Sequence, residues 1–241
     1  MKIALIGYGK MGKAIESIVL VEKKHEIVLK ISKENKHDLT VENLKKADVA
    51  IEFTEPEAAY KNIQLCFEAK IPVVIGTTAW MDKVPEIQEQ CLKHGNTCMV
   101  SSNYSIGVNL FFSLSRNLGL MMKNFPEYHA SIREIHHIEK KDAPSGTAVT
   151  LANDLVSILE KNQWKLKDKN QPMDSDELSI ESIREPNVPG THSVIYSSMI
   201  DEIEIIHTAK SRAGFALGAI KAAEFIHNKK GFFTMHDLFN F

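Results

Sequence analysis

The residues best suited to chemistry stand together in residues 134–147, EIHHIEKKDAPSGT. Two adjacent histidines, His136 and His137, precede Lys140. Imidazole exchanges protons near neutral pH and an ammonium group binds anions, so the segment predicts proton transfer beside an anionic substrate. Adjacent side chains of a strand point to opposite faces, so both histidines can serve one site only if the strand ends beside them. The turn residues that follow indicate that it does.

The same segment leads into a predicted helix that begins with Ser145-Gly146-Thr147. Ser145 is typical of a helix N-cap. The free N–H groups of a helix N-terminus, together with Lys140, also suit a carboxylate, and the two roles are compatible. Zinc is the competing use of the histidines. The sequence has no H-E-x-x-H motif and no cysteine beside them, and Lys140 would repel a cation, so we expect no metal. Glu134 is expected to order the strand or a neighbouring base.

A second chemical motif is GYGKMG, residues 7–12, directly after a short apolar run. Gly7 permits the tight turn, Gly9 lets a pyrophosphate approach the backbone, and Gly12 lets the following helix pack on the strand. Lys10 and Met11 open that helix, whose N-terminal N–H groups attract phosphate. The motif predicts a dinucleotide cofactor.

The residue that would bind the adenine ribose follows the second predicted strand. An acidic residue is expected there in an NAD site, but this sequence has Ser32-Lys33-Glu34. A hydroxyl and a lysine suit a 2′-phosphate, while Glu34 could still reach the ribose. We therefore expect NADPH with NADH accepted, and the choice between the two stays open.

Composition excludes several classes of protein. The 241 residues are 44% hydrophobic and 25% charged, with a net charge of −2, so no basic excess favours nucleic acid or a membrane surface. Cys66, Cys91 and Cys98 form no C-x-x-C pair, which favours reduced thiols in the cytoplasm over a disulfide framework. No apolar run is long enough for a signal sequence or a membrane span.

The elements that must position these motifs follow from hydrophobic periodicity. Short apolar runs alternate with helical patterns in the first half, which predicts a Rossmann-type doubly wound parallel sheet. The second half has strands in series, which predicts an inserted α/β domain with an open mixed sheet. The expected strands are 3–6, 26–31, 47–53, 71–75, 97–101, 127–138, 179–183, 192–198 and 201–208. The expected helices are 10–20, 56–69, 82–94, 108–123, 147–161 and 213–227, with a surface loop at 165–177.

The motif E-x-H-H-x-x-K-x-D-A-P-S-G-T resembles the signature of the dihydrodipicolinate reductases, also called 4-hydroxy-tetrahydrodipicolinate reductases. The resemblance covers nearly the whole chain. Further matching segments are GYGKMG, GTT at 76–78, SNYSIGVN at 102–109, RE at 184–185, PGTH at 189–192 and HTAKSR at 207–212. Two departures stand out: Ala79-Trp80 follows GTT where many members have a glycine, and Ser32 replaces the commoner acidic residue.

The resemblance implies a role for each matching residue. His136 is the general acid, and Lys140 assists proton transfer and binds substrate. His137 binds substrate, and the Ser145-Gly146-Thr147 segment holds a substrate carboxylate. The resemblance and the motifs above together also indicate which residues bind the cofactor. These candidates are Gly7, Gly9, Lys10, Met11, Gly12, Ser32, Lys33, Gly76, Thr77, Thr78, Ser101, Asn103, Tyr104, Arg212 and Phe215.

The resemblance also implies the activity and the organisation of the chain. The activity is NAD(P)H-dependent reduction of a small cyclic dicarboxylate, 4-hydroxy-tetrahydrodipicolinate, in lysine and diaminopimelate biosynthesis. Residues 1–106 with 213–241 would bind the cofactor, and residues 107–212 would bind substrate and build a homotetramer. A reductase of another small acidic imine is the alternative enzyme. A cofactor-binding redox sensor is the alternative from another class, although no basic recognition helix is evident.

Overall fold

The structure is a computed structural model that describes residues 1–167, 174, 176–211 and 213–239. It divides into two compact units, Met1–Asn109 with Arg212–Phe241, and Leu110–Ser211. In the described residues no helix is long and apolar enough to cross a membrane. The predicted assignment of cofactor binding to 1–106 with 213–241, and of substrate binding to 107–212, stays a prediction.

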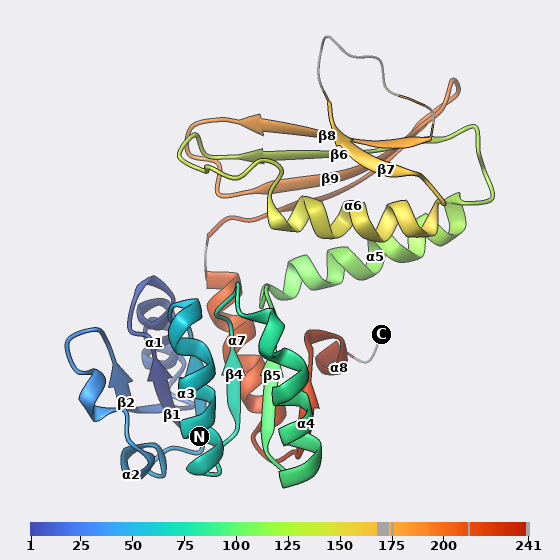
Figure 1. The fold of residues 1–241 in the computed structure, drawn as a ribbon. Helices are drawn as coiled ribbons and strands as arrows, with labels where there is room; N and C mark the ends of the chain where they lie inside the picture. Colours follow the sequence, from blue (N-terminus) through green and yellow to red (C-terminus); the bar gives the residue numbers. More distant parts are fainter. Residues whose placement is uncertain (168–173, 175, 212, 240–241) are drawn as a thin grey trace. The chain divides into compact units, whose positions relative to one another are not determined.

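The first unit contains a six-stranded sheet in the order β11-β5-β4-β3-β1-β2, all parallel (Figure 1). Its strands are β1 Lys2–Ile6, β2 Glu26–Ile31, β3 Val49–Glu52, β4 Val73–Ile75, β5 Thr97–Val100 and β11 Gly231–Phe233. Strands β3, β4 and β5 are buried along their whole length, as expected of a sheet covered on both faces. The predicted Rossmann-type doubly wound sheet is confirmed.

Two apolar clusters fill the two faces of this sheet. One face is covered by α1 Lys10–Glu22 and α7 Ala213–Ile226, whose small residues allow close packing on the strands. The other face is covered by α2 Val41–Leu44, α3 Pro56–Glu68 and α4 Val84–His94. The closest approach is at Gly218 of α7, where a Cβ would lie 1.7 Å from the carbonyl oxygen of Tyr104. A side chain at that position would push α7 away from the segment that follows β5.

The strand order places a switch point between β1 and β3. Chain connections leave these neighbouring strands in opposite directions, so their carboxyl ends open a crevice that suits a ligand. The β1–α1 turn, residues 7–9, lies at this end of the sheet. The topology therefore puts the glycine motif at the position where nucleotides bind in such sheets.

The second unit contains a five-stranded sheet in the order β10-β9-β6-β8-β7. Its strands are β6 His129–His136, β7 Gln163–Leu166, β8 Glu177–Arg184, β9 Thr191–Ser197 and β10 Glu202–Thr208. Pairs β6–β8 and β7–β8 are parallel, and β6–β9 and β9–β10 are antiparallel. The predicted open mixed sheet is confirmed.

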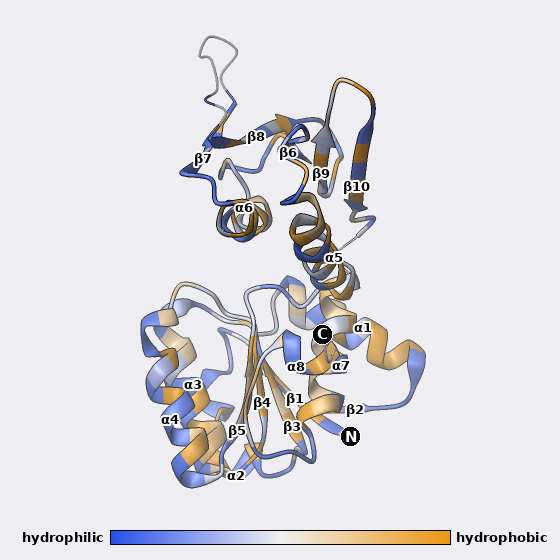
Figure 2. Cartoon of the chain, turned by 90° about the vertical axis from the view of Figure 1, so that its right-hand side faces the viewer, coloured by the Kyte–Doolittle hydropathy of each residue, from blue (hydrophilic) through white to orange (hydrophobic). Residues whose placement is uncertain are grey.

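Two helices, α5 Ile106–Met122 and α6 Gly146–Ile158, supply the apolar residues that cover this sheet. The core they form with the strands includes Phe111, Ile132, Leu151 and Tyr196. Figure 2 shows β10 in alternating hydrophilic and hydrophobic colours, in keeping with its sequence EIEIIHT. Strand β10 is an edge of the sheet, and Ile203 and Ile206 on it are exposed.

The structure corrects several predicted boundaries. The loop predicted at 165–177 is wrong at both ends, because Lys165 and Leu166 pair with β8 and Glu177 is the first residue of β8. Residues 168–173 and 175 of that loop lie outside the described residues. Three further elements, α2, β11 and α8 Met235–Phe239, were not predicted from the sequence. All are five residues or shorter, too short for a clear hydrophobic period.

Candidate active site

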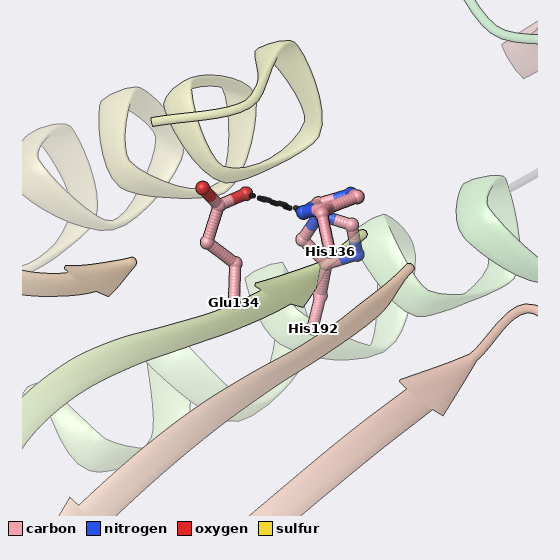
Figure 3. Close-up of side chains that lie close together, drawn as sticks. All are labelled: Glu134, His136 and His192. Atoms are coloured by element: carbon pink, nitrogen blue, oxygen red, sulfur yellow. Dashed lines mark ion pairs between the residues drawn. The ribbon is translucent and has the colours of Figure 1, made fainter. Parts of the chain in front are cut away.

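Three buried side chains of the second unit converge: Glu134, His136 and His192 (Figure 3). Glu134 and His136 lie two residues apart on β6, so their side chains share one face of the strand. In the antiparallel register His192 of β9 stands opposite Glu134. The carboxylate oxygen Oε2 of Glu134 lies 3.2 Å from Nδ1 of His136 and 3.7 Å from Nε2 of His192.

Ser145 joins this cluster to α6. Its hydroxyl accepts a hydrogen bond from the amide of Ala148 at 3.2 Å, so the predicted N-cap is present. The same hydroxyl lies 3.0 Å from Nε2 of His192, and the Ser145 amide donates to the Glu134 carboxylate. The N-terminus of α6 is therefore tied to β6 and β9 by hydrogen bonds.

Strand β8 supplies two more donors to Glu134. The Ser182 hydroxyl donates to Oε1 at 2.6 Å, and Arg184 Nη1 lies 3.3 Å from the same oxygen. Burial raises the pKa of Glu134, but the neighbouring His136 and the hydrogen bonds from Ser145 and Ser182 outweigh burial and hold that pKa well below its usual range. Glu134 is thus a buried, ionised carboxylate.

His192 behaves in the opposite way. Burial, reinforced by the neighbouring His136, lowers the pKa of His192 to about 4. Its ring meets that of His136 edge-on, with centroids 5.0 Å apart. His192 is therefore neutral near pH 7.

The two ring nitrogens of His136 have different surroundings. Nδ1 faces Glu134, as described. Nε2 faces the backbone of Gly190, where a Cβ would lie only 3.0 Å away. The absence of a side chain at Gly190 lets its backbone pack closely against this side of the His136 ring.

The loop after β6 carries the remaining predicted residues. Strand β6 ends at His136, so His137 is the first residue beyond it and is half-buried. Lys140 Nζ lies 2.8 Å from both carboxylate oxygens of Asp142. Arg184 holds this loop through the carbonyl oxygens of Lys140 and Asp142. At the start of α6, Gly146 is exposed and Thr147 half-buried.

Glu134, His136 and His192 also have the spacing of a metal site, since their ligand atoms lie within 4.8 Å of one another. The donors around Glu134 do not suit a cation. Arg184 brings a fixed positive charge to this carboxylate, and Ser145 and Ser182 already donate to it. The arrangement fits a hydrogen-bonded carboxylate that faces an imidazole better than it fits a metal centre.

The glycine motif of the first unit is built from backbone. Gly7 has φ +97°, and the amides of Gly7 and Tyr8 donate to the carbonyl oxygen of Ile31 at the end of β2. A Cβ on Gly12 would lie 2.6 Å from the Gly7 carbonyl oxygen, but one on Gly9 would meet nothing within 4 Å. Helix α1 has no side-chain cap and no acidic residue in its first turn. The turn therefore fits a pyrophosphate, with open space at Gly9 and uncapped N–H groups beside it.

The other predicted cofactor residues lie mostly after the carboxyl ends of neighbouring strands. Ser32 and Lys33 follow β2, Gly76, Thr77 and Thr78 follow β4, and Ser101, Asn103 and Tyr104 follow β5. Phe215 lies in α7, and Arg212 lies outside the described residues. Tyr104 is buried, and its hydroxyl lies 2.9 Å from the carbonyl oxygens of both Ile75 and Met99. Its role at the cofactor stays a prediction.

The loop after Thr78 shows what the Ala79-Trp80 departure does. Ala79 has φ +62°, a left-handed conformation that glycine adopts more easily. The buried indole of Trp80 donates to the carbonyl oxygen of Thr77 at 2.7 Å. The hydroxyl of Thr77 accepts from the amide of Thr54 at 2.7 Å. These two bonds hold the Gly76–Thr78 segment.

Comparisons with known proteins agree with these features. Residues 1–104 match the family described as dihydrodipicolinate reductase, N-terminus, and residues 107–239 match the same family's C-terminus. The chain belongs to the dihydrodipicolinate reductase family. It is therefore an oxidoreductase with an NAD(P)-binding Rossmann domain, and its cofactor is NADH or NADPH.

Individual relatives span the whole chain. The 4-hydroxy-tetrahydrodipicolinate reductase of Christiangramia forsetii is 49% identical over 99% of this chain and 97% of its own length. That of Thermosipho africanus is 36% identical over 99% of this chain and 97% of its own length. Among solved structures, the dipicolinate-bound dihydrodipicolinate reductase from Paenisporosarcina sp. TG-14 has the same fold. Its TM-score is 0.79 at 22% identity, with 97% of each chain covered.

Part of the active-site cluster was not assigned from the sequence. Ser182 was not singled out, and Arg184 and His192 entered only as matching residues with no role assigned. The register of β6 with β8 and β9 brings these residues beside Glu134 and His136. A single histidine or arginine on a strand carries no sequence signal for such a contact.

Proposed function

We propose that this chain reduces 4-hydroxy-tetrahydrodipicolinate to tetrahydrodipicolinate, with His136 as the general acid. The observation that carries the proposal is the buried Glu134–His136–His192 cluster, placed beside the N-terminus of α6 in the family's C-terminal domain. The reaction belongs to the diaminopimelate route to lysine.

The proton is the part of the reaction that the chain itself supplies. NADH or NADPH, when bound, supplies the hydride. Hydride addition to the unsaturated ring leaves negative charge on its conjugated system, which one proton must neutralise. Nδ1 of His136 is directed to Glu134, so Nε2 is the ring nitrogen that can deliver that proton. Lys140 assists transfer from the loop that follows β6 and, with His137, binds the substrate.

The substrate carries two carboxylates, so the site needs two places for an anion. Ser145, Gly146 and Thr147 at the start of α6 form one of them. Gly146 supports this role, because a Cβ there would meet nothing within 4 Å. Lys140 is the second place for an anion, because its ammonium group becomes available when its contact with Asp142 opens.

Cofactor preference is proposed to favour NADPH with NADH accepted. Ser32 and Lys33 follow β2, where a 2′-phosphate would lie. The Ser32 hydroxyl donates to Asn35 and the Lys33 ammonium pairs with Glu55. The negative charge of Glu55 reduces the attraction of Lys33 for phosphate. The contact between Lys33 and Glu55 therefore supports only a modest preference for NADPH over NADH.

We also propose the division of labour between the units and the assembly. The first unit binds the cofactor, and the second binds the substrate and builds a homotetramer. Strand β10 supports this, because it is an unpaired sheet edge with exposed Ile203 and Ile206, and Met199 and Ile200 before it are almost fully exposed. Light scattering of the purified chain measures the mass of the assembly, and the mass of a monomer would refute the homotetramer.

The compartment is proposed to be the cytoplasm. Cys66, Cys91 and Cys98 are free thiols, and the sulfurs of Cys91 and Cys98 lie 3.5 Å apart without a bond. Reduced neighbouring thiols suit a reducing compartment.

The decisive experiment is a coupled assay of reduced-nicotinamide absorbance. The substrate is generated from pyruvate and aspartate semialdehyde by a synthase, and NADH and NADPH are compared. Turnover that is lost in His136→Gln supports the proposal. Cofactor binding without turnover would refute the assignment of 4-hydroxy-tetrahydrodipicolinate as the substrate. It would then favour a reductase of another acidic imine, or a redox sensor if no imine is reduced.

A further inference from the structure

A fully buried carboxylate requires an explanation beyond its place in the sheet. Glu134 has 0% of its surface exposed, and an ionised group without partners in such a place is strongly destabilising. Its two oxygens are held differently. The hydroxyl of Ser182 and the guanidinium of Arg184 contact Oε1, and Oε2 is directed to the rings of His136 and His192.

Arg184 and Ser182 form a fixed support on the neighbouring strand. Arg184 Nη1 donates to the Ser182 hydroxyl at 2.9 Å as well as contacting Glu134 at 3.3 Å. Parallel register places Ser182 beside Glu134 and Arg184 beside His136. The carboxylate therefore cannot rotate away from the imidazole without losing several hydrogen bonds at once.

Of the two rings that Oε2 faces, His136 presents Nδ1 to the carboxylate, which leaves Nε2 for the substrate. A carboxylate beside Nδ1 favours the tautomer with hydrogen on Nδ1 and fixes the plane of the ring. In the charged ring Nε2 also carries a hydrogen, directed away from Glu134. When the Nε2–H bond breaks, its proton passes to the substrate and its electron pair stays on Nε2. The ring is then neutral and keeps its hydrogen on Nδ1.

We propose that Glu134, held by Ser182 and Arg184, is the positioning residue of His136, and that it directs proton delivery through Nε2. This inference rests on the proposed function. The buried carboxylate also anchors α6 through the Ser145 amide, so a purely structural role is the outcome that the test must separate. The other charged or titratable groups around the pair are His192, His207, Lys140, Asp142 and Arg184.

The test compares Glu134→Gln, Glu134→Asp and a control, Asp154→Asn, in the full-length protein. The control removes a carboxylate that pairs with Arg116 elsewhere in the same unit. We expect Glu134→Gln to lower kcat about 10- to 100-fold, with KM for the cofactor unchanged. Glu134→Asp keeps the negative charge and should retain more of kcat than Glu134→Gln.

A direct measurement of the tautomer does not depend on activity. Nitrogen-15 NMR of the histidine rings at alkaline pH should show His136 with hydrogen on Nδ1 in the wild type, and a mixed population in Glu134→Gln. Hydrogen on Nε2 in the wild-type protein would overturn the proposal. So would a Glu134→Gln enzyme that loses thermal stability while the tautomer of His136 stays unchanged. If the wild type itself does not reduce the substrate, the proposed function fails, while the tautomer still reports on Glu134.

Discussion

The glycine turn of the first unit and the histidine cluster of the second are built in opposite ways. The turn uses backbone from one continuous segment, residues 7–12, and its glycines matter for the space they leave. The cluster uses side chains from β6, β8, β9 and α6. A backbone site is therefore sensitive to added atoms, and a side-chain site to removed groups. Substitutions that add or remove one group can test this difference.

The largest effect is expected from His136→Gln in the side-chain site. Loss of a general acid lowers kcat about 100- to 10,000-fold, while cofactor affinity should stay unchanged because the glycine turn is intact. Steady-state rates and a fluorescence titration with NADPH measure the two quantities. His129→Gln, an exposed histidine on the same strand, is the control and should retain full activity. Normal turnover in His136→Gln would end its assignment as general acid.

In the backbone site, Gly9→Ala and Gly12→Ala should differ. A Cβ on Gly9 meets nothing, so the fold should keep its stability while the cofactor Kd rises about tenfold or more, because the pyrophosphate needs that space. A Cβ on Gly12 meets the Gly7 carbonyl oxygen at 2.6 Å, so both stability and binding should fall. This holds even though alanine normally favours a helix interior. Thermal unfolding and cofactor titration separate the cases, and unchanged binding in Gly9→Ala would contradict the role of the turn.

The buried cluster should also make stability depend on pH. His192 has a pKa of about 4 in the folded chain against 6.5 when unfolded, so the unfolded chain binds more protons between those values. The free energy of unfolding should therefore fall by about 3 kcal/mol as the pH drops from 6.5 to 4, and this contribution is fully present above pH 6.5. Denaturant titrations across this range measure it. His192→Gln has no titrating ring and should show a smaller decrease. An equal decrease of the free energy of unfolding in the wild type and in His192→Gln would show that His192 does not cause it.

A smaller effect is expected from Gly146→Ala, an added group in the side-chain site. The position is open and lies in the first turn of α6, so alanine should leave stability unchanged or slightly higher. If a substrate carboxylate occupies that space, KM for the substrate should rise about tenfold with little change in KM for the cofactor, a loss of the order expected for charge-assisted hydrogen bonds. Initial rates at varied substrate test this. An unchanged KM would place the carboxylate elsewhere.

The smallest effect is expected from Lys33→Ala. Its ammonium is exposed and already paired with Glu55, so removing it should weaken NADPH binding by only about two- to fivefold and leave NADH unaffected. The ratio of the two kcat/KM values is the measurement, with Lys24→Ala at the exposed end of α1 as the control. A change in NADH use as large as in NADPH use would refute a phosphate contact.

Local patterns determined much of this protein. The glycine turn, the strand before it and the Ser145 N-cap were predicted from residues that lie next to one another in the sequence, because their conformations depend on near neighbours. The alternation of strands and helices likewise predicted the Rossmann sheet. Local residue types also predicted that this strand ends near the histidine pair, although the predicted end at 138 lies two residues beyond the observed end of β6 at His136.

Only the tertiary structure decided how Glu134 is used. From the sequence, Glu134 was expected to order either its strand or a neighbouring base. Its partners Ser182, Arg184 and His192 lie 48 to 58 positions further along the chain, and the register of β6 with β8 and β9 brings them to one place. Register follows from the packing of a whole sheet face rather than from any short segment. The sequence therefore determined which groups are available for chemistry, and sheet packing decided which of them meet.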